Sequence, residues 1–245
     1  MNSGLYTAYS GMKARADALE ILANNLANVN TTGFKEERAF FSLLNQSSSA
    51  LDQAGTIDAA VNRNVLTHKA VNQAEGSLSL TGRDLDVAIE GNGFLLVQTP
   101  QGIRYTRNGN LHLNAQSVLT TSEGFPVLGA SDKAITLGPG KINISQDGGV
   151  SLDGAAVDSL KIVTFTDLST LQKEGHSLFL ARGGRAAEKA SDATLKPGYL
   201  EQSNVNAVSS VVQMVDILRH FEAIQKSVNL LMNDINSKAI ERLGR

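Results

Sequence analysis

The chain has 245 residues, of which 42% are hydrophobic, enough for a buried core in one large domain or two small ones. Its 22 Lys and Arg residues nearly balance 24 Asp and Glu residues, so it lacks the positive charge typical of nucleic-acid binders. The absence of cysteine excludes disulfides and thiolate chemistry, and no apolar run approaches the roughly 20 residues that cross a bilayer, so we expect no membrane insertion.

Glycine and proline are concentrated in the middle of the chain. Residues 81–197 hold 15 of the 22 glycines and all four prolines. Both residue types favour turns and interrupt helices. We therefore predict an α+β fold, in which long N- and C-terminal helices form a coiled-coil layer and residues 81–197 form an all-β, hairpin-rich domain.

The first predicted helix occupies residues 1–34. Apolar residues recur in it at heptad spacing, although Arg15 interrupts the pattern. We expect the helix to stop near Asn30, because Thr31-Thr32-Gly33 combines β-branched residues with a left-handed stop at Gly33. The predicted interface residues of this helix are Leu5, Met12, Leu19, Leu22, Leu26 and Val29.

Residues 35–80 are predicted to form an extended linker. The part from Asn45 to Gly76 is rich in serine, asparagine and glutamine and shows no clear period. A structureless segment of this length is unusual inside a compact domain and is typical of a linker or a functional segment. We expect it to be extended and to become ordered only on assembly.

Short motifs in the central region predict strands and turns. Asn108-Gly109 separates two alternating segments, which is the strongest short signal for a hairpin. Asp147-Gly148 and Asp153-Gly154 predict further tight turns. Residues 94–97 are apolar at every position and predict a buried central strand.

The strongest helical pattern runs from about residue 205 to 243, within the segment 198–245. Apolar residues fill the a and d positions of three heptads, with charged residues off this seam, until Lys238 interrupts it. A helix this long would overhang a β domain with a radius of gyration of about 13 Å, so we expect part of its apolar face to contact another chain. The predicted seam residues are Met214, Ile217, Phe221, Ile224, Val228, Leu231 and Ile235.

The sequence contains no convincing catalytic pattern. Asp84, Asp86 and Glu90 could lie on one strand face and serve acid–base work on a glycan, but a solvated strand face beside Arg83 is the simpler interpretation. The four histidines show no metal-ligand spacing. Gly91-Asn92-Gly93 lacks the third glycine of a dinucleotide loop and is interpreted as a hairpin turn. We predict no catalytic site, no metal and no cofactor.

Two segments at opposite ends of the chain resemble a known family. Residues 23–35, Ala-Asn-Asn-Leu-Ala-Asn-Val-Asn-Thr-Thr-Gly-Phe-Lys, resemble the N-terminal signature of bacterial flagellar axial proteins, the rod and hook subunits. Residues 198–206, Gly-Tyr-Leu-Glu-Gln-Ser-Asn-Val-Asn, resemble their C-terminal signature. The motif residues are Asn24, Asn25, Asn28, Gly33, Phe34, Ser203, Asn204 and Asn206. The asparagines could fix register as buried Asn does in coiled coils, or could be solvated at a helix end.

Within the rod branch, the chain is most similar to the proximal rod protein and next to the distal rod protein. Residues 83–86, 126–129 and 238–245 favour the proximal type, whereas residues 40–46 would also suit the distal type. The chain lacks the large inserted outer domain of hook subunits.

The resemblance implies a structural, non-enzymatic subunit of the basal-body rod, which assembles helically across the periplasm into a drive shaft that transmits torque and carries the export channel. It also implies that the terminal helices pair antiparallel, with the β domain outside. The expected partners are other copies of itself, other flagellar rod subunits and the flagellar type III export apparatus, without nucleic acid. The first residues lack the basic and apolar regions of a signal peptide, which agrees with export without cleavage.

Two other functions remain open from the residues alone. A peptidoglycan-acting enzyme would depend on Asp84 or Asp86. A secreted adhesin or lectin-like module would bind its ligand as a folded monomer after removal of both terminal segments.

Overall fold

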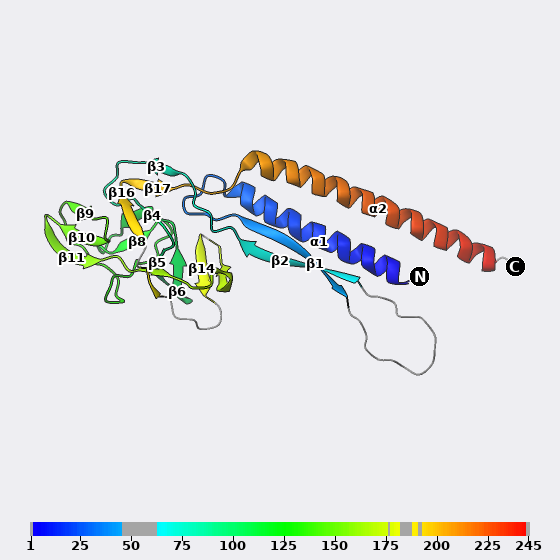
Figure 1. The fold of residues 1–245 in the computed structure, drawn as a ribbon, viewed down its shortest axis with the longest axis horizontal. Coiled ribbons are helices and arrows are strands. Elements are labelled where there is room, and N and C mark those ends of the chain that lie inside the picture. Colours follow the sequence, from blue (N-terminus) through cyan, green and yellow to red (C-terminus); the bar gives the residue numbers. More distant parts are fainter. Residues whose placement is uncertain (1, 46–62, 176, 182–187, 191–192, 244–245) are drawn as a thin grey trace, which may run out of the picture. The chain divides into compact units, whose positions relative to one another are not determined.

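The computed structural model describes residues 2–45, 63–175, 177–181, 188–190 and 193–243. They form an α+β fold of two long helices and many strands, whose described pairings are antiparallel (Figure 1). The chain divides into two compact units, each assembled from segments that are distant in sequence. The helical unit consists of residues 1–26, 37–70 and 206–245, and the β unit of residues 27–36 and 71–205.

The helical unit contains α1 (Asn2–Ala27), α2 (Ala207–Leu243) and a two-stranded sheet of β1 (Glu37–Asn45) and β2 (Arg63–Val71). The predicted C-terminal helix is confirmed to within two residues at its start. The N-terminal helix ends slightly before Asn30, where Thr31 turns the chain by donating its N–H to the Asn28 carbonyl at 3.1 Å. In Figure 1 the two helices run in opposite directions.

Strands β1 and β2 differ from the extended linker expected over residues 35–80. Their sequences lack the strict alternation that marks a half-buried strand; Phe40 and Phe41 are adjacent, and both are exposed. Pairing with a distant segment therefore decides their conformation. Residues 46–62 of the predicted polar stretch lie outside the described residues.

The β unit is built around β5 (Phe94–Thr99), a central strand of the largest sheet. The order in that sheet is β13 (Leu171–Lys173), β14 (Leu178–Ala181), β6 (Gly102–Thr106), β5, β12 (Ile162–Thr164) and β15 (Glu188–Lys189), and a short helix, η1 (Leu168–Thr170), precedes β13. Residues 94–97 are at most 4% exposed, which confirms the predicted buried central strand.

Smaller sheets bring the end of the β region back to its beginning. Strand β3 (Leu78–Leu80) pairs with β17 (Tyr199–Glu201), and β4 (Val87–Glu90) pairs with β16 (Thr194–Pro197). The remaining strands are β7 (Leu111–Leu113) with β8 (Leu119–Thr121), and the sheet of β9 (Ile142–Ile144), β10 (Gly149–Leu152) and β11 (Ala155–Ser159). The β unit therefore includes more of the chain than residues 81–197, the domain expected from composition.

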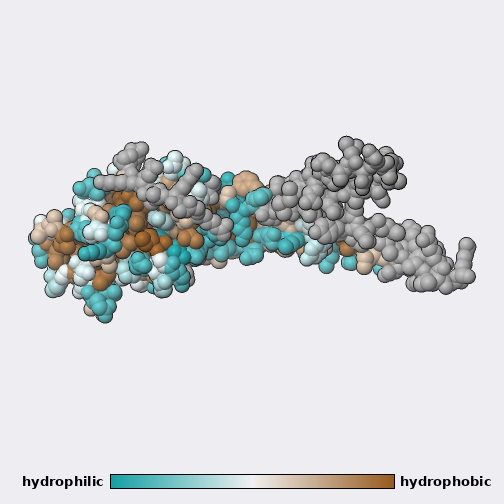
Figure 2. All heavy atoms as spheres, turned by 90° about the horizontal axis from the view of Figure 1, so that it is seen from below, coloured by the Kyte–Doolittle hydropathy of each residue, from teal (hydrophilic) through white to brown (hydrophobic). Residues whose placement is uncertain are grey.

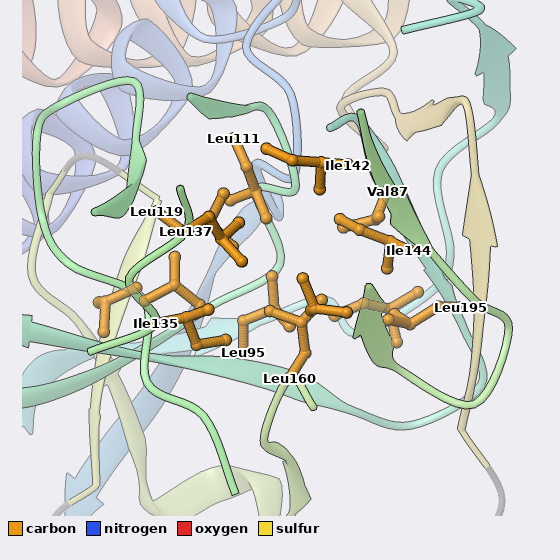
Figure 3. Packing of buried hydrophobic residues seen from close by; sticks show 14 of the residues in the cluster. Val87, Leu95, Leu111, Leu119, Ile135, Leu137, Ile142, Ile144, Leu160 and Leu195 are labelled. Carbon is orange, nitrogen blue, oxygen red and sulfur yellow. The ribbon is translucent and has the colours of Figure 1, made fainter. Parts of the chain in front are cut away.

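Strand β5 supplies both hydrophobic cores, because successive side chains of a strand point to opposite faces. Leu95 and Val97 join the larger cluster, whose leucine, isoleucine and valine side chains converge in Figure 3. Phe94 joins the smaller cluster and meets Phe165 and Phe179 edge to face, with ring centroids 6.0 and 5.5 Å apart.

Two of the predicted turns are confirmed, and two predicted hairpins are wrong. Asp153-Gly154 joins β10 to β11 with both residues at positive φ, and the Asp147-Gly148 turn joins β9 to β10. Asn108-Gly109 joins no hairpin, since β6 pairs with β5 and β14, whereas β7 pairs with β8. Gly91-Asn92-Gly93 likewise connects strands of different sheets.

The Asn108-Gly109 turn is used for tertiary contact. A Cβ at Gly109 would lie 1.7 Å from the Val87 carbonyl oxygen, so the close approach of β4 requires glycine. The Asn108 side chain accepts hydrogen bonds from the Thr32 hydroxyl at 2.8 Å and from the Asn110 N–H at 3.1 Å. The contacts with Val87 and Thr32 come from residues far outside the local motif, which a pattern search cannot detect.

The predicted solvated acidic face is also wrong. Asp84 is exposed, but Asp86 is 1% exposed, forms a bridge with Asn110 and has Arg83 at 3.5 Å. Glu90 is half-buried and lies 3.4 Å from the Lys196 ammonium. Because Asp86 is buried, Asp84 is exposed and Glu90 is half-buried, the three carboxylates do not form one solvated strand face.

Some large apolar side chains of the β unit reach its surface, where they lie among hydrophilic residues (Figure 2). The exposed ones are Leu80, Ile103, Leu113 and Val157.

The two-faced burial of β5 yields a stability prediction. We expect Leu95→Ala to lower the free energy of unfolding by about 2–5 kcal/mol, because it leaves a cavity in the larger cluster. The control Ile103→Ala, at a side chain that is 43% exposed, should cost well under half of that. Urea unfolding measures both, and equal losses would contradict the assignment of β5 as the shared core strand.

Candidate functional site

The two terminal motifs meet inside the β unit. Gly33 donates its N–H to the Glu201 carbonyl at 2.8 Å, and the Asn204 N–H points to the Phe34 carbonyl at 3.4 Å. On the other side, the Asn72 N–H donates to the Glu36 carbonyl at 2.7 Å. Residues 33–36 therefore run between residues 201–204 and the start of the β region; we call this arrangement the junction.

Asn204 joins three segments of the junction through its side-chain amide. Its Oδ1 accepts the Glu36 N–H at 2.7 Å. Its Nδ2 donates to the Asn72 carbonyl at 2.9 Å and to the Ala74 carbonyl at 2.8 Å. Asparagine suits this position because its short planar group carries both an acceptor and two donors.

A buried ion cluster lies at the centre of the junction. The Glu201 carboxylate contacts Lys35 Nζ at 2.6 Å and Arg107 Nε at 2.7 Å, and all three side chains are at most 3% exposed. Glu201 Oε1 also accepts the Gly76 N–H at 3.0 Å. Lys35 Nζ donates further to the Ala74 carbonyl at 2.8 Å. These partners are needed, because burying a charge without a partner costs free energy.

Arg107 extends the cluster to the connection between β4 and β5. Its Nη1 donates to the carbonyls of Gly91 and Gly93 at 2.9 and 3.1 Å, and its Nη2 donates to the Ile89 carbonyl at 2.8 Å. The planar guanidinium can make these bonds and the Glu201 contact at once, which an ammonium group could not do.

Burial and charge in the cluster shift the pKa values of Glu201 and Lys35. Burial alone would raise the pKa of Glu201, but Arg107 and Lys35 outweigh it and hold that pKa below its ordinary value. Burial, together with the Arg107 charge, lowers the pKa of Lys35, while Glu201 and the more distant Glu75 oppose that shift. The cluster is therefore built around an ionised Glu201.

Phe34 and Gly33 complete the junction. Phe34 is buried, and Lys173 Nζ lies 3.0 Å from its ring centroid while donating to the Lys35 carbonyl at 3.0 Å. Gly33 has φ +66°, and a Cβ there would lie 2.5 Å from the Arg107 carbonyl carbon. Gly33 does not stop α1, which ends at Ala27, so its expected role is corrected to close packing against residue 107.

The other motif residues organise the helix ends. Asn25 is buried and pairs with the backbone of Glu37 through both amide atoms, at 2.7 and 2.9 Å. Asn28 accepts the Thr31 hydroxyl at 3.1 Å. Asn206 caps α2 by accepting the Ser209 N–H at 2.9 Å, and Ser203 Oγ accepts the Val205 N–H at 3.3 Å. Asn24 is exposed. Asn25 thus fixes a strand of its own chain, which neither interpretation of the asparagines anticipated.

The predicted seam on α2 is a half-buried stripe. Met214, Ile217, Phe221, Ile224 and Val228 are partly covered, while all the residues between them are exposed. Next to the seam, Val208 is 76% exposed, and Val211, Val215 and Leu218 are 42–45% exposed. The side chains of Leu231 and Ile235 lie outside the described residues.

On α1 the most buried stripe differs from the predicted one. Leu22 is buried, but Met12, Leu19 and Leu26 are only partly covered, and the Leu5 side chain lies outside the described residues. Val29, predicted on the same helix, follows its end at Ala27 and is also partly covered. The buried face of the helix consists of Ala14, Ala18, Ile21, Leu22 and Asn25. Two alanines and an asparagine carry little weight in a hydrophobic pattern, so the sequence did not single out this stripe.

The described residues contain no group of three or more acidic, histidine or cysteine side chains that could hold a metal ion. No helix in the described part of the chain is both long and apolar enough to cross a bilayer.

Three family models match the N-terminal, central and C-terminal segments of the chain. The model described as flagella basal body rod protein matches residues 5–35, the flagellar hook protein FlgE/F/G D1 domain matches residues 88–152, and the flagellar basal body rod FlgEFG protein C-terminal model matches residues 196–230. The flagellar basal-body rod protein FlgF of Caulobacter vibrioides is 35% identical, with 100% of this chain and 99% of the relative covered. This chain belongs to the flagellar basal-body rod protein family.

Other relatives carry the same family name. FlgG of Buchnera aphidicola subsp. Schizaphis graminum is 34% identical, with 94% of this chain and 95% of the relative covered. FlgF of Rhizobium meliloti is 32% identical, with 100% and 99% covered. The two terminal family models contain Lys35 and Glu201, so the rod-family motifs are the segments that build the junction.

The sequence did not identify Lys35, Arg107 and Glu201 as partners. One signal was available, because the motif at 198–206 contains one acid, Glu201, and the motif at 23–35 contains one base, Lys35. The third member, Arg107, was assigned to a hairpin, and its role follows from the fold alone.

A comparison of two glycines separates the effect of close packing at Gly33 from the effect of its positive φ. Gly33 and Gly82 have nearly equal φ values of +66° and +69°, but a Cβ at Gly82 would meet no atom within 4 Å. We expect Gly82→Ala to cost about 1 kcal/mol of unfolding free energy through φ strain. Gly33→Ala should cost about 1–3 kcal/mol more through overlap with residue 107. Equal losses in urea unfolding would show that Gly33 serves conformation alone.

The ion cluster predicts a specific response to acid. Because the folded-state pKa of Glu201 lies below the ordinary value of 4.5, its stabilising contribution is present above that pH and is lost as pH falls through the lowered pKa. At pH 7, Glu201→Gln should lower stability by about 3–5 kcal/mol, since it leaves Lys35 and Arg107 without their buried partner. Below pH 4.5 the difference between wild type and variant should shrink. A pH-independent difference in urea unfolding would contradict an ionised Glu201.

Proposed function

We propose that this chain is a structural subunit of the bacterial flagellar basal-body rod, and that its terminal helices form the layer through which subunits assemble. The observation that carries the proposal is the apolar surface of α2 that remains uncovered in the single chain, in a member of a family named for the rod. A structural role, rather than an enzymatic one, follows from the names of the relatives.

The first half of α2 carries two adjacent apolar stripes. One is the half-buried a/d seam, and the other consists of Val208, Val211, Val215 and Leu218 at spacings of three and four residues. One neighbouring helix can cover one stripe, so a helix with two stripes needs two neighbours. In the proposed layer, α1 of the same chain is one neighbour and a helix of another subunit is the second.

The energetic reason for assembly is the burial of this surface. Full burial of a Val, Leu, Ile, Phe or Met side chain contributes about 1.5–3 kcal/mol, and the seam and its neighbouring stripe hold such residues at successive turns. Repeated head-to-tail contacts of this kind generate open helical filaments. The antiparallel direction of α1 and α2 in Figure 1 supports their pairing as a coiled-coil layer.

The assembled layer accounts for the mechanical role. We propose that helices packed around a channel carry the export path and transmit torque, with the β unit outside them. In this proposal residues 1–34 and 198–245 serve assembly, residues 35–80 contribute the β1–β2 sheet and a connection, and residues 81–197 form most of the β unit. The partners are further copies of this chain, other rod subunits and, during export, the flagellar type III apparatus.

We further propose the proximal rod type. The motifs at residues 83–86, 126–129 and 238–245 favour it. Position along an intact basal body, determined by cryo-electron microscopy, tests this assignment against the distal type.

A seam substitution tests the assembly proposal. Ile224→Asp places a carboxylate in the proposed layer, where burial without a partner costs at least several kcal/mol. We expect the purified variant to keep the wild-type unfolding midpoint of its β unit, while rods and swimming are lost. The matched control, Gln225→Asp, adds the same charge at the adjacent exposed residue and should leave motility near normal. Normal swimming of the Ile224 variant would contradict the proposal.

A further inference from the structure

One carboxylate in the β unit joins two parts of the chain. The contacts of Glu201 reach Lys35 on one side and Arg107 on the other, and the three residues come from segments far apart in sequence. Each cation in turn holds a different piece of backbone, so the cluster has two arms.

The first arm fixes the segment by which the chain passes from α1 into the β unit. Lys35 binds Glu201 and the Ala74 carbonyl, and the backbone of residues 33–36 bonds to Glu201 on one side and Asn72 on the other. The Glu201 carboxylate also accepts the Gly76 N–H. This arm therefore holds residues 33–36 and 72–76 together.

The second arm fixes the connection between β4 and β5. Arg107 carries three hydrogen bonds to the carbonyls of Ile89, Gly91 and Gly93, and Glu201 holds its Nε. Without Glu201 the guanidinium keeps its carbonyl contacts but loses its buried counter-charge. The orientation of Arg107, and with it residues 89–93, then depends on neutral bonds alone.

We infer that Glu201 is a two-armed latch, a conformational device in which one carboxylate holds both the entering segment 33–36 and the β4–β5 connection. Its loss releases both segments together while the β9–β10–β11 sheet, whose strands contain no member of the ion cluster, stays folded. Residue 201 also directly precedes the segment that leads into α2.

The alternative is that Glu201 contributes to overall stability without a local role. The two interpretations differ in where the backbone loosens. The latch loosens two defined segments, whereas a general effect loosens every segment of the β unit, including residues 142–159 of the β9–β10–β11 sheet.

Hydrogen–deuterium exchange on the full-length chain distinguishes these outcomes. For Glu201→Gln we expect exchange to rise about tenfold or more in peptides covering residues 30–37 and 86–93, because a buried cation that loses its partner is strongly destabilising. Residues 142–159 should rise by a clearly smaller factor, because they share only the loss of overall stability. Glu90→Gln serves as the control, since that residue forms a half-exposed pair with Lys196.

Two further variants test the arms separately. Lys35→Met keeps the contact between Glu201 and Arg107 and should loosen residues 30–37 alone. Arg107→Gln keeps the contact between Glu201 and Lys35 and should loosen residues 86–93 alone. The latch is refuted if Glu201→Gln loosens one segment only or loosens residues 142–159 as much as both segments, or if either single-arm variant loosens both segments.

Discussion

The buried contact between Glu201, Lys35 and Arg107 is the constraint on which the organisation of this chain depends. Three charges without access to water are tolerated only when each has partners, and here the partners come from both terminal motifs and from the middle of the β region. The requirement brings distant segments to one point. Asn204, Gly33 and Phe34 then fill the remaining hydrogen-bonding and packing positions around it.

The two units differ in how completely they bury their apolar surface. In the β unit, β5 is covered on both faces, by the aliphatic cluster on one side and the phenylalanine cluster on the other. In the helical unit, α2 keeps two apolar stripes that its own chain covers only in part. A subunit that folds first and then assembles needs a core that is fully buried in the single chain. It also needs apolar helix surface that only another subunit can cover.

The corrections share one physical cause, which is that long-range contacts override local preference. Asn108-Gly109 has the local chemistry of a hairpin turn, but Thr32 and Val87 approach it so closely that the chain uses it for packing. Asp86 has a polar neighbour pattern, yet the fold buries it beside Arg83. Strands β1 and β2 pair across a long separation, which no local period could indicate.

The sequence by itself determined the elements whose signal is local and repeated. The heptads predicted α2 nearly to its ends, the run from Phe94 to Val97 predicted a buried strand, and Asp153-Gly154 predicted its turn. It also carried the motifs that place the chain in the rod family. Only the tertiary structure decided that Lys35, Arg107 and Glu201 are partners, that Gly33 packs against residue 107, and that α1 buries Ala14 and Ala18 along with Leu22. Those features depend on which distant segments become neighbours, and the spacing of residues along one segment holds no information about that.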